Sequence, residues 1–456
     1  MLAAVLLLSF VSAVTGFVLA QYYSVDVLAS LTGVAEDCWL DWGVQIGRHC
    51  FSDYAITVDE GMRPNPWGPY PTFLPWDNYQ AGWVNYPAAA LVPQLLFAVP
   101  TKLLGVPKLG LIAFLLALTV AVLAPAFWAS RGARGLERVV VFVVLGAAAM
   151  PAWAVIDRGN SVGFLAPIAL FFLLALRRER WGLVTIAVVL AALLKPQFAI
   201  LAVALFASRQ WRLGGIAVGG AVISNLAAYL LWPRDFPLNV VQSIKGVLGY
   251  GGSPYAVTSP YNVSFASGLF HITNRVVPLF GYSVLIVSVV CILGLGRRIP
   301  PVMVGIALLA TATLFPFQAF KYYLVFALPI AALVVRDPDG PPGSGIFDRL
   351  ANLGDRRRAV GICVSLAAAL SITWIALPSK PTQALIAGQK GVIGIVGTTP
   401  LVPTTVAATS LLWLVTCASI IVSYARRPAP RALKGACTDL APGELKPAAA
   451  SRLDRP

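Results

Sequence analysis

Two carboxylates stand four residues apart in a polar stretch that follows the first long apolar run. Asp37 and Asp41 lie in the segment 36–43, and in a helix this spacing turns both side chains to the same face. A carboxylate near a membrane surface can take the proton of an attacking hydroxyl if its pKa and reach suit. The alternative is structural: Glu36 and Asp37 would stabilise a helix N-terminus through its macrodipole.

Two lysines interrupt otherwise apolar sequence. Lys195 stands before Pro196 and Gln197, and Lys321 stands before Tyr322. A lysine at membrane depth costs about 3 kcal/mol unless it lines a wet cavity or meets an anion. Such cations suit the developing charge of a lipid phosphate leaving group. The alternative is that each side chain reaches along its aliphatic stem to the membrane interface.

Further polar candidates lie in connections between apolar runs. The turn 157–160 contains Arg158 and Asn160, and Tyr261 and Asn262 lie in a later long connection. For the turn, a structural Asp–Arg pair that caps the next helix and a substrate contact both remain open.

Aromatic residues recur about every three positions between 67 and 86 and end at Tyr86. This spacing is typical of an aromatic belt at a membrane interface. The alternative is a wall that contacts a sugar or a prenyl chain.

The elements that must position these residues are apolar. The chain has 456 residues, of which 58% are hydrophobic and only 12% are charged, and repeated apolar runs approach the ~20 residues that span a bilayer. In hydrocarbon the backbone must satisfy its own hydrogen bonds, so the runs predict helices and an all-α class. Thirteen runs are present: 3–22, 86–104, 109–130, 139–156, 161–176, 182–194, 197–208, 213–232, 278–296, 301–318, 322–335, 359–377 and 402–424.

Charge bias orients these runs. The net charge is +15, but the basic residues form short clusters between apolar runs, which indicates juxtamembrane positions and not nucleic-acid binding. If 86–104, which contains three prolines, lies at the outer interface, twelve spans remain and 22 of the 34 Lys and Arg residues fall inside. The predicted inner segments are 131–138, 177–180, 209–212, 297–298, 336–358 and 426–456.

This topology puts all the candidate residues on the outer side. It predicts two large outer loops, 24–108 with interfacial helices and 233–277, on a membrane domain of residues 1–425 with a disordered basic tail, 426–456. The runs 182–194 and 197–208 are each too short to span and predict a helical pair joined at Lys195. Cys38 and Cys50 share the first outer loop and pair only if that loop faces an oxidising compartment.

Several of these stretches together resemble one family of enzymes. Asp37 with the later Gly47 and Tyr54, the Asn-Tyr-Pro at 85–87, the turn 157–160, the Lys-Pro at 195–196 and the Lys-Tyr-Tyr-Leu at 321–324 follow the order and spacing of its motifs. The family is the polyprenyl-phosphate-sugar-dependent GT-C glycosyltransferases of family 87, and the resemblance covers roughly 35–335. Here Lys321 replaces a histidine, one proline follows Tyr86 in place of two, and the turn lacks the family's glutamine.

The resemblance implies a GT-C fold, a polyprenyl-phosphate sugar donor carrying a hexose such as mannose or a pentose, and an inverting reaction. It implies a lipid or glycan acceptor and a site on the outer, periplasmic face of a bacterial plasma membrane. Asp37 is then the base candidate and Asp41 the second. The other proposed donor or substrate contacts are Lys195, Lys321, Arg158, Asn160, Gln197, Tyr86, Tyr261, Asn262 and Tyr322.

No Cys/His spacing suggests zinc, and we expect the reaction to need no metal or other cofactor. Two other classes remain open. A transporter or lipid flippase would use the same broken helices and should show internal repeats, and a non-catalytic assembly protein would not need its outer polar residues to converge.

Overall fold

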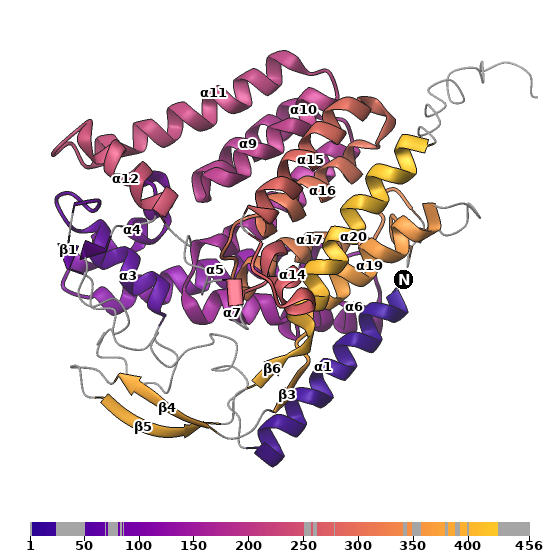
Figure 1. The fold of residues 1–456 in the computed structure, drawn as a ribbon, viewed down its shortest axis with the longest axis horizontal. Helices are drawn as coiled ribbons and strands as arrows, with labels where there is room; N and C mark the ends of the chain where they lie inside the picture. Colours follow the sequence, from indigo (N-terminus) through magenta and orange to yellow (C-terminus); the bar gives the residue numbers. More distant parts are fainter. Residues whose placement is uncertain are drawn as a thin grey trace, which may run out of the picture.

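The computed structural model describes residues 2–23, 51–68, 70–71, 81–82, 84, 86–249, 257–258, 262–277, 279–340, 344–348, 357–378, 382–387, 393–398 and 401–426. Within these ranges the chain is mainly helical (Figure 1). Three short antiparallel strand pairs accompany the helices, and the helical class predicted from the sequence is confirmed.

The α-helices follow one another along the chain as α1 (Leu2–Tyr23), α3 (Ser52–Gly61), α4 (Ala88–Leu103), α5 (Pro107–Ser130), α6 (Gly135–Phe142), α7 (Met150–Arg158), α8 (Leu165–Arg177), α9 (Trp181–Leu194), α10 (Val203–Ala207), α11 (Trp211–Ala228), α12 (Leu238–Gly249), α14 (Phe265–Thr273), α15 (Phe280–Leu295), α16 (Pro301–Leu314), α17 (Ala327–Val335), α19 (Arg357–Ile372) and α20 (Thr404–Arg426).

Tighter or wider helical turns and the strands complete the described elements. The 3₁₀ segments are η3 (Ser161–Phe164), η4 (Pro196–Ala202), η5 (Tyr229–Leu231), η6 (Gly296–Arg298) and η7 (Lys321–Phe326), and η2 (Val143–Ala147) is a π-helix. The strand pairs are β1 (Tyr70–Pro71) with β2 (Ala81–Gly82), β3 (Ala376–Pro378) with β6 (Leu401–Pro403), and β4 (Thr382–Ala387) with β5 (Ile393–Thr398).

Helix length and composition are those of a helical membrane protein. Among the described residues, four helices are long and apolar enough to cross a membrane: Pro107–Ser130, Trp211–Leu231, Phe280–Arg298 and Ala407–Arg426. A fifth span is possible if Gly135–Ala147 and Met150–Arg158, bent by 46°, count as one. Eight further apolar helices are shorter, so the described helices do not establish the twelve spans predicted from the sequence.

The long helices turn apolar side chains outward, which is the pattern expected where lipid replaces water around a protein. Large exposed apolar residues follow one another on α11 and α15: Ile216, Val222, Ile223, Leu226, Ile286, Val287, Val290 and Leu293.

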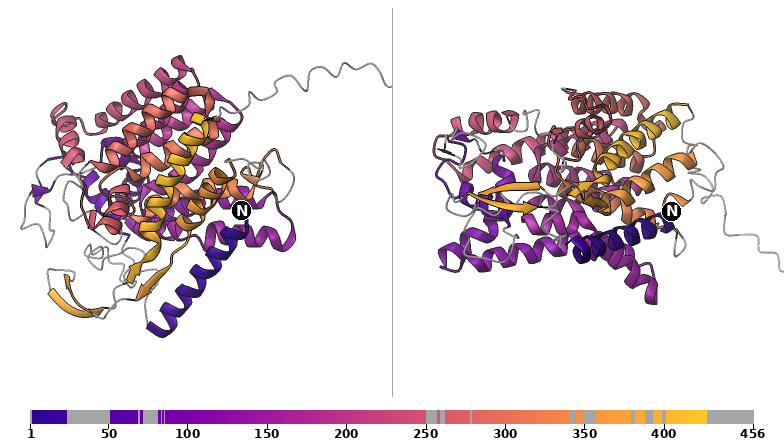
Figure 2. Two further views of the ribbon diagram at one scale, coloured as in Figure 1. Left: turned by 45° about the vertical axis from the view of Figure 1, so that its right-hand side comes forward. Right: turned by 60° about the horizontal axis from the view of Figure 1, so that its bottom comes forward.

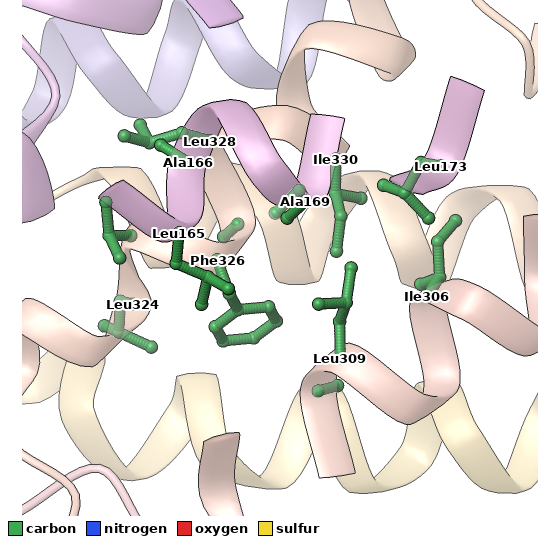
Figure 3. Close-up of a cluster of buried hydrophobic side chains, with 14 of the residues drawn as sticks. Leu165, Ala166, Ala169, Leu173, Ile306, Leu309, Leu324, Phe326, Leu328 and Ile330 are labelled. Atoms are coloured by element: carbon green, nitrogen blue, oxygen red, sulfur yellow. The ribbon is translucent and has the colours of Figure 1, made fainter. Parts of the chain in front are cut away.

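The interior is also apolar and is built largely from the shorter helices. Figure 3 shows side chains of α8, α16, η7 and α17 packed together, with Phe326 among Leu165, Leu309 and Ile330. Phe326 also lies 5.1 Å from the ring centroid of Trp413 on α20. Filling the core in this way holds short helices that could not be stable alone.

Segments predicted to lie on the inner side contact one another. Arg336, which follows α17, donates a hydrogen bond to the Trp128 carbonyl near the end of α5. Arg177, at the end of α8, pairs with Asp337. The sequence reading overlooked that Asp337 and Asp339 form an Asp-x-Asp pair, but Arg177 occupies both carboxylates.

Segments predicted to lie on the outer side also meet, at the opposite ends of the helices. The Trp232 indole donates to the Gly61 carbonyl at 2.9 Å, and the Asn65 amide donates to the Asp235 carboxylate at 3.0 Å. The first and second outer loops are thereby joined. Figure 1 places α3, α4 and α12 at the same end of the molecule, and Figure 2 shows β4 and β5 beyond the helix ends.

The inner ion pair leads to a first prediction. Arg177→Ala should lower the free energy of unfolding by about 3 kcal/mol, because the Asp337 side chain is fully buried and loses its cation. Arg178→Ala is the matched control, since Arg178 approaches Asp339 only at 3.8 Å in an exposed pair, and such pairs contribute ~0.5 kcal/mol. Urea unfolding of both variants measures the difference, and equal losses would contradict the assigned roles.

The predicted break at Lys195 is present. Helix α9 ends at Leu194, Lys195 has an extended backbone (φ −151°, ψ 120°), and η4 begins at Pro196. The two arms are matched in length, since α9 rises ~21 Å and η4 with α10 also rises ~21 Å. Each arm is shorter than the ~30 Å hydrocarbon core, so neither arm alone is long enough to span it.

Candidate functional site

Three short helices begin at one place, on the side predicted to face outward. They are η3 with α8, η4 with α10, and η7 with α17. Each starts in 3₁₀ geometry beside a polar residue of the predicted site. Segments η3 and η4 start directly after Asn160 and Lys195, and η7 starts at Lys321 itself. Segment η3 contacts both η7 and α9, so the three starts are neighbours. Broken or shortened membrane helices are tolerated where their ends line a cavity or are buried in protein.

The centre of this region is a carboxylate from the first outer loop. Asp53, in the first turn of α3, accepts hydrogen bonds from Arg158 Nε at 2.9 Å and from Arg158 Nη2 at 2.8 Å. Asn160 Nδ2 donates to the same carboxylate at 2.7 Å. Asp53, Arg158 and Asn160 are all at least nine-tenths buried. This is a bidentate, charge-assisted arrangement of the strongest kind.

The cations around Asp53 keep it ionised. Burial by itself raises the pKa of the Asp53 carboxyl, but the charge of Arg158 and the hydrogen bonds from Arg158 and Asn160 lower it more. The ammonium of Lys195 contributes to the same lowering. The net pKa is below the ordinary value for aspartate, so the side chain is a carboxylate at neutral pH.

The ring of Tyr86 lies between Lys195 and this cluster. The Lys195 ammonium lies 3.6 Å from the centroid of Tyr86 and 5.9 Å from that of Tyr323, within the range of cation–π attraction. Asn160 Nδ2 lies 3.5 Å from the Tyr86 hydroxyl. No described residue accepts a hydrogen bond from the Lys195 ammonium, although Lys195 is only 7% exposed. A buried cation in this condition favours an anionic ligand.

Aromatic side chains of η7 form another wall. The Arg158 guanidinium lies 5.4 Å from the ring centroid of Tyr322 and 5.7 Å from that of Phe320. Tyr322 stacks between Phe320 and Tyr323. The site therefore joins groups from α3, α7, the α9–η4 break and η7 with Tyr86 of the first outer loop.

Two predicted contacts have structural partners instead. Gln197 donates to the Ala312 carbonyl of α16 at 3.1 Å. Asn262 is fully buried, donates to the Phe317 carbonyl and accepts from the Ala319 amide. Asn262 thus fastens the segment that leads into η7 and positions the site without lining it.

Lys321 does not join the Asp53 cluster. Its ammonium lies 3.3 Å above the ring of Trp374, in a cavity bordered by α7, α19 and α20. The expectation that both lysines share one cavity is not met by the described residues, because Asp53 and Lys195 do not line this cavity. Lys321 and Tyr322 are adjacent on a 3₁₀ turn, which points successive side chains about 120° apart.

The remaining calls fall outside the described residues: Asp37, Asp41, Tyr261 and the pair Cys38 and Cys50. Asp53 itself was missed by the sequence reading. The signal was available, because Asp53 interrupts the mostly apolar segment 51–58 in the way that singled out the two lysines.

The aromatic series 67–86 has one described member in the interior of the outer loops. Trp67 is fully buried, lies 4.8 Å from the ring centroid of Tyr229 and 5.4 Å from that of Trp232, and donates to the Tyr86 carbonyl at 2.8 Å. Trp67 is thus neither a belt residue nor a substrate wall. It fixes the backbone of Tyr86.

The turn at Gly159 sets a sharp requirement. Gly159 ends α7 at φ +65°, and a Cβ there would lie 2.8 Å from Tyr54 Cβ, next to Asp53. Gly159→Ala should cost about 3 kcal/mol of folding free energy from αL strain and overpacking, and should weaken substrate binding. Gly135→Ala is the matched control, since Gly135 has φ +53° with open space around it and should cost only about 1 kcal/mol. Equal effects in denaturant titrations would contradict the close approach.

Among the described residues, no group of three or more His, Cys, Asp or Glu side chains could hold a metal ion. The fold and the site together define a helical protein with several helices long and apolar enough to cross a membrane, and with a buried, charged cluster where its short helices begin. No protein-family model matches the chain, and no curated protein matches its sequence.

Proposed function

We propose that the protein is an integral membrane glycosyltransferase that moves a hexose or pentose from a polyprenyl-phosphate donor to a lipid or glycan acceptor. The observation that carries the proposal is the meeting of a first-loop carboxylate, Asp53, with Arg158, Asn160, Tyr86 and Lys195 at the break in a membrane hairpin. Sugar transfer from a lipid phosphate needs both an anionic base and a cation for the leaving phosphate.

The reaction follows from these groups. The acceptor hydroxyl attacks the anomeric carbon, its proton passes to a carboxylate, and the bond from that carbon to the phosphate oxygen breaks. The electron pair leaves with the prenyl phosphate, whose charge Lys195 stabilises. Attack opposite to the leaving group inverts the anomeric centre. Tyr86, which is partly exposed, offers an aromatic surface for the sugar or the first prenyl units.

A first-loop carboxylate is the proposed base. Asp53 is the candidate with known surroundings: Arg158 keeps it ionised, and its Oδ1 accepts one hydrogen bond while its Oδ2 accepts two. Asp37 and Asp41 remain the candidates from the family pattern. Matched Asn variants of the three decide among them: we expect the Asp53 variant to lose turnover, and loss in the Asp37 variant alone would transfer the role to Asp37.

The membrane setting belongs to the same proposal. We place the site on the outer, periplasmic face of a bacterial plasma membrane, in a GT-C fold of about twelve helical segments, and expect no metal requirement. The support is the separation of basic inner contacts, such as Arg177 with Asp337, from the outer cluster. The shorter helices that end at the site would make up the rest of the twelve predicted helical segments.

The direct test is a transfer assay. The full chain in nanodiscs would receive prenyl-phosphate hexoses and pentoses with labelled sugars, together with a total lipid extract of the source membrane. We expect one donor to yield labelled lipid or glycan without added metal. If every donor stays intact while the folded protein binds it, the transferase proposal fails.

The alternative is a lipid flippase, which the membrane hairpin at Lys195 favours, because such breaks also line transport paths. A flippase would equilibrate a fluorescent prenyl-phosphate lipid across vesicle leaflets and leave its sugar bond intact. Transfer without leaflet exchange would exclude the flippase.

A further inference from the structure

A cavity lined in part by polar side chains lies one helical turn from the Asp53 cluster. Its walls are α7, η7, α19 and α20, and Ala154 of α7 lines it, four residues before Arg158. None of Asp53, Arg158 or Lys195 lines it. The cavity therefore has its own set of polar groups.

Two of these groups have buried polar atoms without partners. Trp374 is 3% exposed and Thr409 is 1% exposed, and neither the Trp374 Nε1 nor the Thr409 Oγ1 has a hydrogen-bond partner among the described residues. An unpaired buried donor is costly, so two at one cavity require an explanation. The neighbouring Ser371 differs, because its hydroxyl accepts from Trp413 Nε1 at 2.8 Å and donates to the Ala367 carbonyl.

The backbone of Trp374 is held in place by hydrogen bonds from a distant helix. Ser12 of α1 accepts from the Trp374 amide at 2.9 Å and donates to its carbonyl at 3.0 Å. Both backbone groups of Trp374 are thus satisfied by a single side chain from a distant helix. The indole is held firmly while its N–H is left for another partner.

The third group is a cation. Lys321 is 5% exposed, and its ammonium lies 3.3 Å above the Trp374 ring. An ammonium, an indole N–H and a hydroxyl are all able to donate, and the first two cannot accept. A cavity lined in this way is complementary to an anion with several acceptor oxygens, such as a phosphate group.

The rest of the lining is apolar and includes Met150, Leu324 and Leu370. The adjoining helix α1 exposes Phe10 and Phe17 on its outer side, where lipid is expected. We propose that this cavity binds the head group of a phosphate-bearing lipid, with the phosphate between Lys321, Trp374 and Thr409 and its chains toward the bilayer. This site is separate from the one proposed for the leaving phosphate at Lys195, and it does not require that sugar transfer occurs.

Binding to the full chain in a maltoside detergent, which carries no phosphate, tests the proposal. The probes are dioctanoyl phosphatidic acid, dioctanoylglycerol with the same chains, and inorganic phosphate. We expect the wild type to bind phosphatidic acid at least tenfold more tightly than either of the others. Absence of phosphatidic acid binding would overturn the site, and equal binding of inorganic phosphate would overturn its assignment to a lipid.

Variants locate the bound phosphate. Thr409→Val and Trp374→Phe remove one unpaired donor each and keep the shape, so each should weaken phosphatidic acid binding about tenfold. The thermal midpoint of the free protein should stay level or rise, because a buried unsatisfied group is removed. Thr416→Val is the matched control on the same helix, since Thr416 is buried with its hydroxyl donating to Leu412; its phosphatidic acid affinity should not change.

Lys195→Met separates this site from the other. Its phosphatidic acid affinity should equal that of the wild type. If Lys195→Met abolishes binding while Thr409→Val leaves it within twofold, the phosphate lies at Lys195 and the second site does not exist. None of these readouts depends on sugar transfer, so either proposal can fail alone.

Discussion

Asp53→Asn is expected to abolish turnover, with a loss of at least about 1,000-fold, and to lower the free energy of unfolding by about 3–5 kcal/mol. The physical reason is the buried pair. Arg158 donates two hydrogen bonds to Asp53, and both side chains are about 10% exposed. A neutral amide leaves the guanidinium buried without its counter-charge and removes the proton acceptor. Turnover and urea unfolding of the purified full chain measure both effects.

A double variant separates folding from chemistry. In Asp53→Asn with Arg158→Gln no uncompensated charge is buried, so stability should return to within about 1–2 kcal/mol of the wild type. Turnover should stay absent. Asp59→Asn, on the same helix α3, is the matched control, because Asp59 forms only an exposed pair with Arg63. Recovery of transfer in the double variant would show that Asp53 is structural.

Lys195→Met has the second largest expected effect, and here activity should fall without a loss of stability. Transfer should fall at least about 100-fold, because the removed ammonium would stabilise the leaving phosphate. Stability should stay level or rise, since Lys195 is buried without a hydrogen-bond partner among the described residues. Thus Asp53 and Lys195 would be distinguished by the sign of their stability changes.

The control for this variant is Lys245→Met, which removes an exposed lysine on α12 and should leave turnover and stability unchanged. Binding of polyprenyl phosphate, the expected product, gives an independent readout and should weaken in the Lys195 variant alone. A large stability loss without a change in product binding would instead make Lys195 a packing residue.

Much of the architecture could be predicted because membrane proteins encode it locally. Basic clusters predict which segments lie on the inner side. Contacts such as that of Arg336 with the Trp128 carbonyl join segments predicted to lie there. The sequence Lys195-Pro196 predicts a break, because proline removes a donor and a lysine is costly in hydrocarbon. The break is present at that residue.

The helix lengths could not be predicted in the same way. An apolar run reports hydrophobicity, but the packing of neighbours decides whether it remains one helix. The run that ends in the turn 157–160 is bent by 46° between η2 and α7. The strands β3 to β6 follow α19 in a segment predicted only as a connection; β4 and β5 pair across a short loop, and β3 and β6 pair outside them in the sequence.

The site, too, could be predicted only in part. Five predicted residues belong to the cluster: Arg158, Asn160, Tyr86, Lys195 and Tyr322. Each is a polar or aromatic residue at the predicted outer end of a helix or loop. The pairing of Asp53 with Arg158 required tertiary information, because the two residues are 105 positions apart in the sequence.

The direction of Lys321 also could not be derived from its place in the sequence. The 3₁₀ geometry of η7 turns Tyr322 toward Arg158 and Lys321 toward Trp374. An α-helix at this point would have given other directions. The adjacent residues Lys321 and Tyr322 therefore point to different places: Tyr322 to the Asp53 cluster and Lys321 to the neighbouring cavity.

The central claim is that one pocket pairs a first-loop carboxylate with the Lys195 ammonium to cleave a lipid-linked sugar. Its most direct measurement is single-turnover cleavage of a labelled polyprenyl-phosphate sugar by nanodisc-embedded wild type, the Asp53→Asn/Arg158→Gln variant and Lys195→Met. We predict sugar transfer in the wild type and none above background in the two folded variants. Equal cleavage by all three proteins, or an intact donor with the wild type for every sugar offered, would contradict the claim.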